Sequence, residues 1–244
     1  MLKISNLSVE YKGNLALENI SLHIPEGSCT GVIGPNGAGK STLMKSILEM
    51  IPTKSGSVTI NETPLKNFKR KIAYVAQRSE IDLSFPITVF DTVLTGTYPN
   101  LKLFQKPRKK ERQKAEHALH KLGLDDFKDR QLSALSDGQL QRVFIARALA
   151  QEADYYFLDE PFVGIDMMSE KIIINILEEL RQNGKTIIIV HHNLHNVKAY
   201  FDYLIILNKK LIGADYTAQC FTNENLQKAY GEALGNIIIK ESEG

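Results

Sequence analysis

The sequence contains little cysteine, little net charge and no long apolar run. Its two cysteines, Cys29 and Cys220, lie far apart, so they offer neither the spacing of a metal site nor a disulfide framework. We expect both to be buried thiols. No stretch approaches the roughly 18 consecutive apolar residues that span a bilayer, and the first residues lack the apolar run of a secretory signal. These absences predict a cytoplasmic protein that reaches a membrane only through a partner.

A formal net charge of +2 gives no reason to expect a nucleic-acid partner. The densest positive charge lies in residues 106–114, which continue as an amphipathic helix with apolar residues at Ala115, Ala118 and Leu119. The pattern favours a solvated helix face over the alternative, a nucleic-acid patch, so we predict no nucleic-acid partner. With 244 residues, 43% of them hydrophobic and 24% charged, the chain is long enough to bury a sizeable core.

One stretch combines a glycine-rich turn with the context that gives such a turn its chemistry. Gly34 is followed after four residues by Gly39, Lys40 and Ser41, which is the spacing of a P-loop. We expect a strand at residues 30–33 and an amphipathic helix after the turn. Backbone N–H groups at a helix N-terminus favour phosphate oxygens, so Lys40 is expected to reach the β- and γ-phosphates and Ser41 to ligate Mg²⁺. A glycine-rich connection without a ligand is the weaker alternative. The predicted nucleotide loop comprises Gly34, Pro35, Asn36, Gly37, Ala38, Gly39, Lys40, Ser41 and Thr42.

Strands and helices alternate on both sides of a helical stretch. Short apolar segments between residues 2 and 24 predict a β-meander, and helical patterns follow at 89–95, 108–122 and 139–149. We therefore predict an α/β fold: a P-loop NTPase core with a mostly parallel sheet, an N-terminal antiparallel β subdomain and an inserted helical subdomain. The expected boundaries are 1–84 for the first part of the core, 85–149 for the helical subdomain, 150–215 for the rest of the core and 216–244 for a C-terminal tail with a helical pattern at 225–233.

Three predicted strands end in polar residues, and in an open parallel sheet ligands lie beyond the carboxyl ends of the strands. The residues are Gln77 after strand 72–75, Asp159 and Glu160 after strand 155–158, and His191 and His192 after strand 186–190. Asp159 is expected to hold Mg²⁺ through water, and Glu160 to polarise an attacking water. Plainer readings stay open: a polar turn for the two carboxylates and a surface loop for Gln77. A metal cluster of His191, His192 and His195 is disfavoured because no cysteine or carboxylate completes it.

A second predicted helix begins at a polar segment. Ser136 followed by Gln139 forms a capping box, which explains both residues without any ligand. The functional alternative is a second anion site built from Ser136 and the backbone at Gly138. One chain does not need two phosphate-binding faces for one nucleotide, but two chains arranged head to tail do.

These motifs, in this order and at these spacings, resemble the nucleotide-binding subunits of ABC transporters over about residues 2 to 215. They are Gly34 to Ser41, Gln77, Leu135 to Gln139, Tyr155 to Glu160, Gly164 to Asp166, and His192. The resemblance implies that ATP and Mg²⁺ are the cofactors and that ATP is held between two subunits, the P-loop of one facing the signature segment of the other. It also implies a catalytic role for Lys40.

The resemblance further implies a role for each motif residue. Tyr11 is expected to stack on adenine, although it could also be a half-buried aromatic at a strand end. Gln77 is expected to sense Mg²⁺ and the membrane partner, Glu160 to act as the base, and His192 to contact the γ-phosphate. The remaining assignments are Asp159 to Mg²⁺, Asp166 to the dimer contact, and Ser136, Gly138 and Gln139 to the γ-phosphate held by the other subunit.

Asp137 departs from this family, which usually has glycine there. A carboxylate at this position would stand near the γ-phosphate bound by the partner and repel it. We therefore expect Asp137, counted among the nucleotide-facing residues, to restrain ATP-driven closure until the membrane partner is engaged.

The absence of a spanning segment resembles importers with separate subunits. Residues 81–89, 159–166 and 190–194 are most similar to subunits of manganese, zinc or iron importers, with manganese favoured. Expected partners are a second copy, an integral membrane permease that docks against residues 77–93 and, indirectly, an extracytoplasmic metal-binding protein. The expected location is the cytoplasmic face of the membrane. The alternatives are an importer ATPase for an iron chelate or cobalamin, a soluble ABC ATPase without a permease, and a non-enzymatic scaffold.

Overall fold

The computed structural model describes residues 1–231, which divide into two compact units. Unit 1 comprises residues 1–68 and the chain from residue 188 onward, and unit 2 comprises residues 69–187. The last part of the helix expected at 225–233 lies outside the described residues. Within residues 1–231, no helix combines the length and the apolar character needed to cross a membrane.

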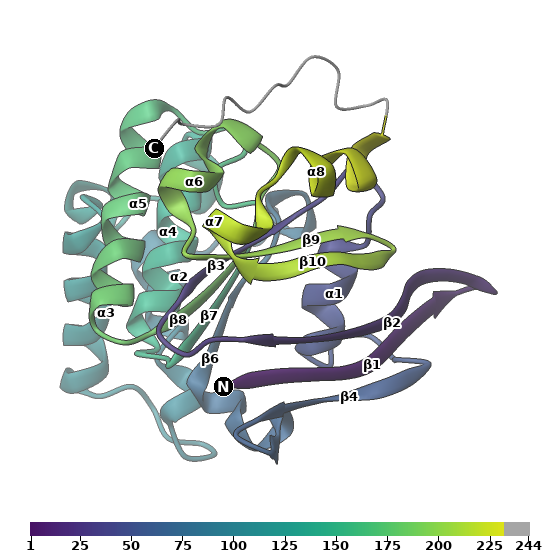
Figure 1. Ribbon diagram of the computed structural model, residues 1–244. Helices are drawn as coiled ribbons and strands as arrows, with labels where there is room; N and C mark the ends of the chain where they lie inside the picture. The colour runs from purple at the N-terminus through teal and green to yellow at the C-terminus, as the bar shows by residue number, and fades with distance from the viewer. Residues whose placement is uncertain (232–244) are drawn as a thin grey trace. The chain divides into compact units, whose positions relative to one another are not determined.

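The first sheet of unit 1 is antiparallel, with strand order β2-β1-β4-β5 (Figure 1). Its strands are β1 (Leu2–Tyr11), β2 (Asn14–Ile24), β4 (Ser55–Ile60) and β5 (Thr63–Pro64). The apolar residues change parity between Ile4 and Leu7, yet both side chains are buried. A bulge makes this possible: Asn6 adopts a left-handed φ of 51°, and the β1–β2 register shifts between Ile4 and Leu7. The segments expected as separate short strands are therefore one strand.

The second set of strands in unit 1 has the order β10-β9-β3-β8. β3 (Cys29–Ile33) pairs in parallel with β9 (Tyr203–Asn208), and β9 forms the predicted antiparallel hairpin with β10 (Lys210–Tyr216). Every residue of β3 and of β8 (Thr186–Val190) is buried, as a strand covered on both faces requires. The helices of this unit are α1 (Lys40–Ile47), α6 (Val197–Tyr200), α7 (Thr217–Cys220) and α8 (Asn223–Tyr230), with a 3₁₀ turn η6 (Leu194–Asn196).

Unit 2 contains the parallel pair β6 (Ile72–Val75) and β7 (Tyr155–Asp159). Its helices are α2 (Val89–Thr95), α3 (Lys109–Lys121), α4 (Asp137–Ala150) and α5 (Met167–Gln182). α4 packs against the other three helices and against β6, so it is the centre of this unit (Figure 1). Short 3₁₀ turns connect these elements: η1 (Leu65–Lys71), η2 (Arg78–Glu80), η3 (Tyr98–Asn100), η4 (Asp125–Phe127) and η5 (Leu132–Ala134).

Burial agrees with the expectations drawn from composition. Cys29 and Cys220 are both buried thiols, and burial raises the pKa of Cys220 to about 11. In α3, Ala115, Ala118 and Leu119 face the interior while the charged residues before them lie on the outer face. The basic stretch is thus the solvated side of an amphipathic helix.

Candidate nucleotide-binding site

The loop that precedes α1 is built so that only glycine fits at two of its positions. A Cβ at Gly34, whose φ is 156°, would lie 2.1 Å from the carbonyl oxygen of Leu207 on β9. A Cβ at Gly39, whose φ is 94°, would lie 2.6 Å from Leu17 Cδ2 on β2. The loop is therefore pressed against both sheets of unit 1, and its backbone is held in a left-handed conformation that glycine adopts without strain.

Lys40 opens α1 and turns back into the loop. Its Nζ donates hydrogen bonds to the carbonyl oxygens of Gly34, at 2.8 Å, and Pro35, at 3.0 Å. The side chain is buried, so the ammonium charge is concentrated at the loop. The N-terminal N–H groups of α1 and this charge together make the loop a site for phosphate.

Two other residues of unit 1, Tyr11 and His192, were expected near the nucleotide, and both are exposed, whereas the neighbouring His191 is buried. Tyr11 ends β1 with 46% of its surface exposed, so its ring is accessible. His192 is exposed beyond the end of β8, whereas His191 is buried with its ring edge-on to Phe201 at 5.5 Å. Burial first, and the positive charge of His192 second, lower the pKa of His191 to about 4. Within residues 1–231 the structure brings together no group of three or more His, Cys, Asp or Glu side chains that could hold a metal ion.

In unit 2 the parallel register brings two motif residues together. Val75 on β6 lies opposite Leu158 on β7, so the residues two positions further on leave the sheet side by side. There, Gln77 Nε2 donates a hydrogen bond of 2.9 Å to Glu160 Oε2. Glu160 has a left-handed φ of 51°, a conformation that costs a non-glycine residue about 1–2 kcal/mol and is typical of functional positions.

Asp159 precedes Glu160 at the carboxyl end of β7 and is 1% exposed. Its negative charge acts on Tyr74 of the neighbouring strand β6. Burial is the larger cause that raises the pKa of the Tyr74 hydroxyl, and the charge of Asp159 is the second. In an open parallel sheet ligands lie beyond the carboxyl ends of the strands, and Asp159 occupies such a strand end, the position expected from the sequence for the carboxylate assigned to Mg²⁺.

The segment before α4 forms the capping box that the sequence predicts. The Ser136 hydroxyl accepts from the backbone N–H of Gln139 at 3.3 Å, and Gln139 Oε1 accepts from the backbone N–H of Ser136 at 3.0 Å. Both side chains therefore define where α4 begins. Ser136 is nevertheless exposed, so its hydroxyl remains accessible from outside.

The N-terminus of α5 lies against the N-terminus of α4. Asp166 caps α5: its carboxylate accepts from the backbone N–H of Ser169 at 2.9 Å and from the Ser169 hydroxyl at 2.8 Å. These bonds, the backbone one first, lower the pKa of Asp166. A Cβ at Gly138 would lie 2.6 Å from Ser169 Oγ and 2.7 Å from Asp166 Oδ2. Glycine at position 138 is therefore what allows the two helix ends to touch.

Sequence reasoning missed one residue of this region, Arg78. Its guanidinium forms an ion pair with Asp137, the first residue of α4. Asp137 was expected to repel the γ-phosphate bound by a partner subunit, and the structure adds that its carboxylate is paired with a cation of the same subunit. The available signal was a cation directly after Gln77, but nothing in the sequence relates position 78 to position 137.

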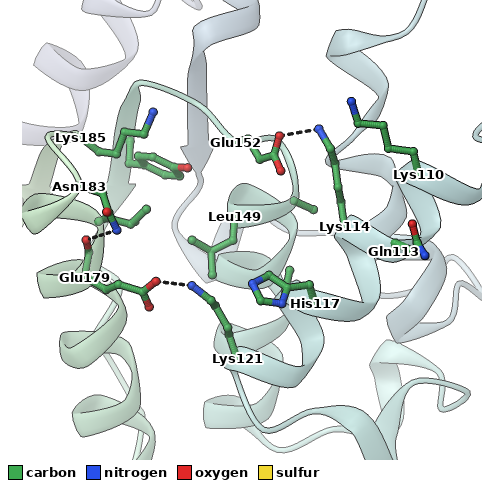
Figure 2. Close-up of a pocket in the computed structure, with 14 residues that line it drawn as sticks. Lys110, Gln113, Lys114, His117, Lys121, Leu149, Glu152, Glu179, Asn183 and Lys185 are labelled. Carbon is green, nitrogen blue, oxygen red and sulfur yellow. Dashed lines mark hydrogen bonds and ion pairs between the residues drawn. The ribbon is translucent and has the colours of Figure 1, made fainter.

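A groove of about 550 Å³ lies in unit 2 between α3 and α5, and of the motif residues only Tyr156 lines it (Figure 2). Its lysines are largely paired with carboxylates across it: Lys114 with Glu152, and Lys121 with Glu179. Since these pairs neutralise one another, the groove adds nothing to the phosphate chemistry of the site.

Comparisons with known proteins agree with this geometry. The family model described as "ABC transporter" matches residues 17–163. The chain is 55% identical, over 95% of its length and 97% of the relative's, to the manganese transport system ATP-binding protein MntB of Listeria monocytogenes. It is 44% identical, over 97% of its length and 89% of the relative's, to the zinc transport system ATP-binding protein TroB of Treponema pallidum. A solved structure, the dimeric structure of the bacterial ABC transporter cassette MJ0796, superposes with a TM-score of 0.79 at 28% identity, covering 88% of this chain and 98% of that one.

Proposed function

Since this chain is an ATP-binding subunit of the ABC transporter family, and as such an ATPase, we propose that two copies complete each other's sites head to tail. The P-loop of one copy would face Ser136, Gly138 and Gln139 of the other, and each interface would hold ATP. The family fold of an antiparallel N-terminal sheet, a mostly parallel main sheet and a helical part provides the two surfaces.

The observation that carries this proposal is the exposed apolar surface beside the capped ends of α4 and α5. Met167 and Met168, the first residues of α5, are 87% and 75% exposed directly after Asp166. Large apolar side chains at a glycine-rich junction of two helix ends suit a surface that a second chain covers. The solved cassette to which the chain is similar is described as dimeric, which supports the pairing of two copies.

Mg²⁺ fits the donor set that the chain offers. Each unit offers a hard oxygen ligand of the kind that Mg²⁺ prefers alongside phosphate oxygens: the Ser41 hydroxyl in unit 1 and the buried Asp159 carboxylate in unit 2. The ion would supply positive charge to neutralise the phosphates.

Different residues of the chain bind the nucleotide and act in its hydrolysis. Lys40 and the loop from Gly34 to Thr42 hold the phosphates, and Tyr11 stacks on adenine. Glu160 accepts a proton from the attacking water, while the hydrogen bond from Gln77 fixes the orientation of its carboxylate. His192, exposed beyond β8, contacts the γ-phosphate.

The transported substrate is assigned through the relatives. The chain is the ATP-binding subunit of a manganese or zinc ABC importer, and we favour manganese because the 55% identical relative is a manganese system. A permease with which it pairs would sit in the membrane, with an extracytoplasmic metal-binding protein delivering the ion. The subunit would lie on the cytoplasmic face, organised as a core of residues 1–84 and 150–215, a helical subdomain of 85–149 and a tail of 216–244.

The docking surface for the permease is proposed at residues 77–93. The segment begins at Gln77, so a displacement by the permease would reach Glu160 through one hydrogen bond. Phe85 within it is exposed, which suits contact with an apolar partner helix. Recovery of a multi-span permease with the chain from solubilised membranes tests this, and recovery only of soluble complexes would contradict it.

The decisive experiment uses Glu160→Gln in the full chain. This variant keeps the shape of the side chain but removes the base, so we expect turnover to fall at least about 100-fold and an ATP-bound dimer to accumulate. Size-exclusion chromatography with light scattering, with and without ATP, measures the dimer. Lys40→Ala is the control that should show neither ATP binding nor dimer. Normal hydrolysis by Glu160→Gln would exclude Glu160 as the base.

A further inference from the structure

Arg78 and Asp137 connect two motifs that have no relation in the sequence. Arg78 follows Gln77 at the start of η2, and Asp137 is the first residue of α4, directly after Ser136. Their side chains form an ion pair although 42% and 47% of their surfaces are exposed. The pair therefore lies at the surface of unit 2, at the segment that the proposed sandwich turns toward the partner's nucleotide.

Asp137 lies where its negative charge adds to that of a second carboxylate, Asp166. Its Oδ2 lies near Gly164, where an added Cβ would be 3.9 Å away, and Gly164 belongs to the loop that leads to Asp166. Two carboxylates thus flank Gly138, those of Asp137 and Asp166. The second is engaged by Ser169 through two hydrogen bonds, whereas the first depends on Arg78 for compensation.

We propose that Arg78 is a positioning residue that neutralises Asp137 and so allows the partner's γ-phosphate to approach Ser136 and Gly138. This inference rests on the proposed ATP sandwich and deepens it. Like charges brought together at an interface oppose association, and a guanidinium paired with the carboxylate removes that opposition.

The Arg78–Asp137 ion pair also connects two motif segments of one subunit, the one that contains Gln77 and the one that begins at Ser136. Gln77, the neighbour of Arg78, holds Glu160, and Asp137 neighbours Ser136. A shift of residues 77–78 therefore alters the orientation of the base and the charge at the signature segment together. A permease docked on residues 77–93 would act on both through this short segment.

The competing explanation is an ordinary surface ion pair, which contributes little to stability and nothing to activity. A cycle of variants in the full chain separates the two: Arg78→Ala, Arg78→Lys, Asp137→Gly and the double variant Arg78→Ala/Asp137→Gly. The readouts are the ATP concentration that gives half-maximal hydrolysis and, in the Glu160→Gln background, the ATP concentration that gives half-maximal dimer.

Arg78→Ala should raise both concentrations about tenfold when Asp137 is present, and should change neither when position 137 is glycine. Arg78→Lys should recover part of the loss because it keeps the charge. Lys114→Ala is the matched control, since it breaks the ion pair with Glu152 in the groove of Figure 2, whose lining contains none of Gln77, Glu160 and residues 136–139, and it should leave both readouts unchanged.

Equal effects of Arg78→Ala in both backgrounds, or no effect in either, would overturn the proposal for Arg78. If Glu160→Gln with Arg78 intact forms no dimer with ATP, the sandwich itself is wrong and the role of Arg78 falls with it. If that variant forms the dimer and the loss of Arg78 leaves its ATP dependence unchanged, only the role of Arg78 is excluded.

Discussion

Gln77 Nε2 donates a hydrogen bond of 2.9 Å to Glu160 Oε2 at the carboxyl ends of β6 and β7. The contact follows from the parallel register, in which Val75 lies opposite Leu158, and from the left-handed backbone at Glu160. A single amide thus orients the carboxylate assigned as the base. A movement of the segment that contains Gln77 would therefore change the orientation of the Glu160 carboxylate toward the attacking water.

Gln77→Asn should lower the turnover number about tenfold while ATP still binds. The asparagine side chain keeps the amide but is one methylene shorter, so it loses the hydrogen bond of 2.9 Å to Glu160. Steady-state kinetics and nucleotide titration measure the two effects separately. In the Glu160→Gln background the same substitution should have no further effect on turnover. Additive losses in the double variant would mean that Gln77 acts by another route.

Gly138→Ala should destabilise the protein by about 1 kcal/mol, the typical value of a helix cap, although alanine is normally the better helix residue. The reason is that the new Cβ would lie 2.6 Å from Ser169 Oγ and 2.7 Å from Asp166 Oδ2, so the cap of α5 must move. Urea unfolding measures the change. Ser169→Ala removes the nearer of these two atoms, so Gly138→Ala should lower the free energy of unfolding less in the Ser169→Ala background than in the wild type. Full additivity of the two substitutions would contradict the steric account.

Acid should destabilise the protein partly through His191. Its pKa is about 4 in the folded chain and about 6.5 when unfolded, so between these values only the unfolded state binds the proton. The free energy of unfolding should therefore fall as pH decreases from 6.5 to 4, by about 3 kcal/mol from this residue. Urea midpoints measured across this range test it.

The matched variants are His191→Gln and His192→Gln, since the second residue is exposed. The slope of stability against pH should flatten strongly in His191→Gln and only slightly in His192→Gln, because burial is the larger cause of the lowered pKa of His191 and His192 the smaller one. Equal slopes in all three proteins would show that His191 does not carry the effect.

Much of the fold follows from local pattern. The alternation of apolar runs and turn residues predicted β3, β6, β7 and β8, and Ser136 with Gln139 predicted the start of α4. These are short-range effects, in which burial, capping and helix period act within a few residues. The N-terminal meander was less accurate because a bulge at Asn6 depends on the neighbouring strand as well as on the residue itself.

The phosphate-binding chemistry of the nucleotide loop was likewise predicted from the loop's own residues. Gly34, Lys40 and Ser41 at fixed spacing imply a phosphate site because the loop, the lysine and the helix N-terminus are contiguous in the chain. The same holds for the carboxylates that end β7. In both cases the interacting groups are near neighbours in sequence.

The sequence alone therefore determined the family and the main elements, and it predicted which residues meet ATP. Only the tertiary structure decided which of these residues touch one another: Gln77 with Glu160, Gly138 with Ser169, and Arg78 with Asp137. Such contacts depend on strand register and helix packing, which join segments distant along the chain. The charge of Asp137 is paired because folding brings Arg78 beside it, a contact that the sequence does not reveal.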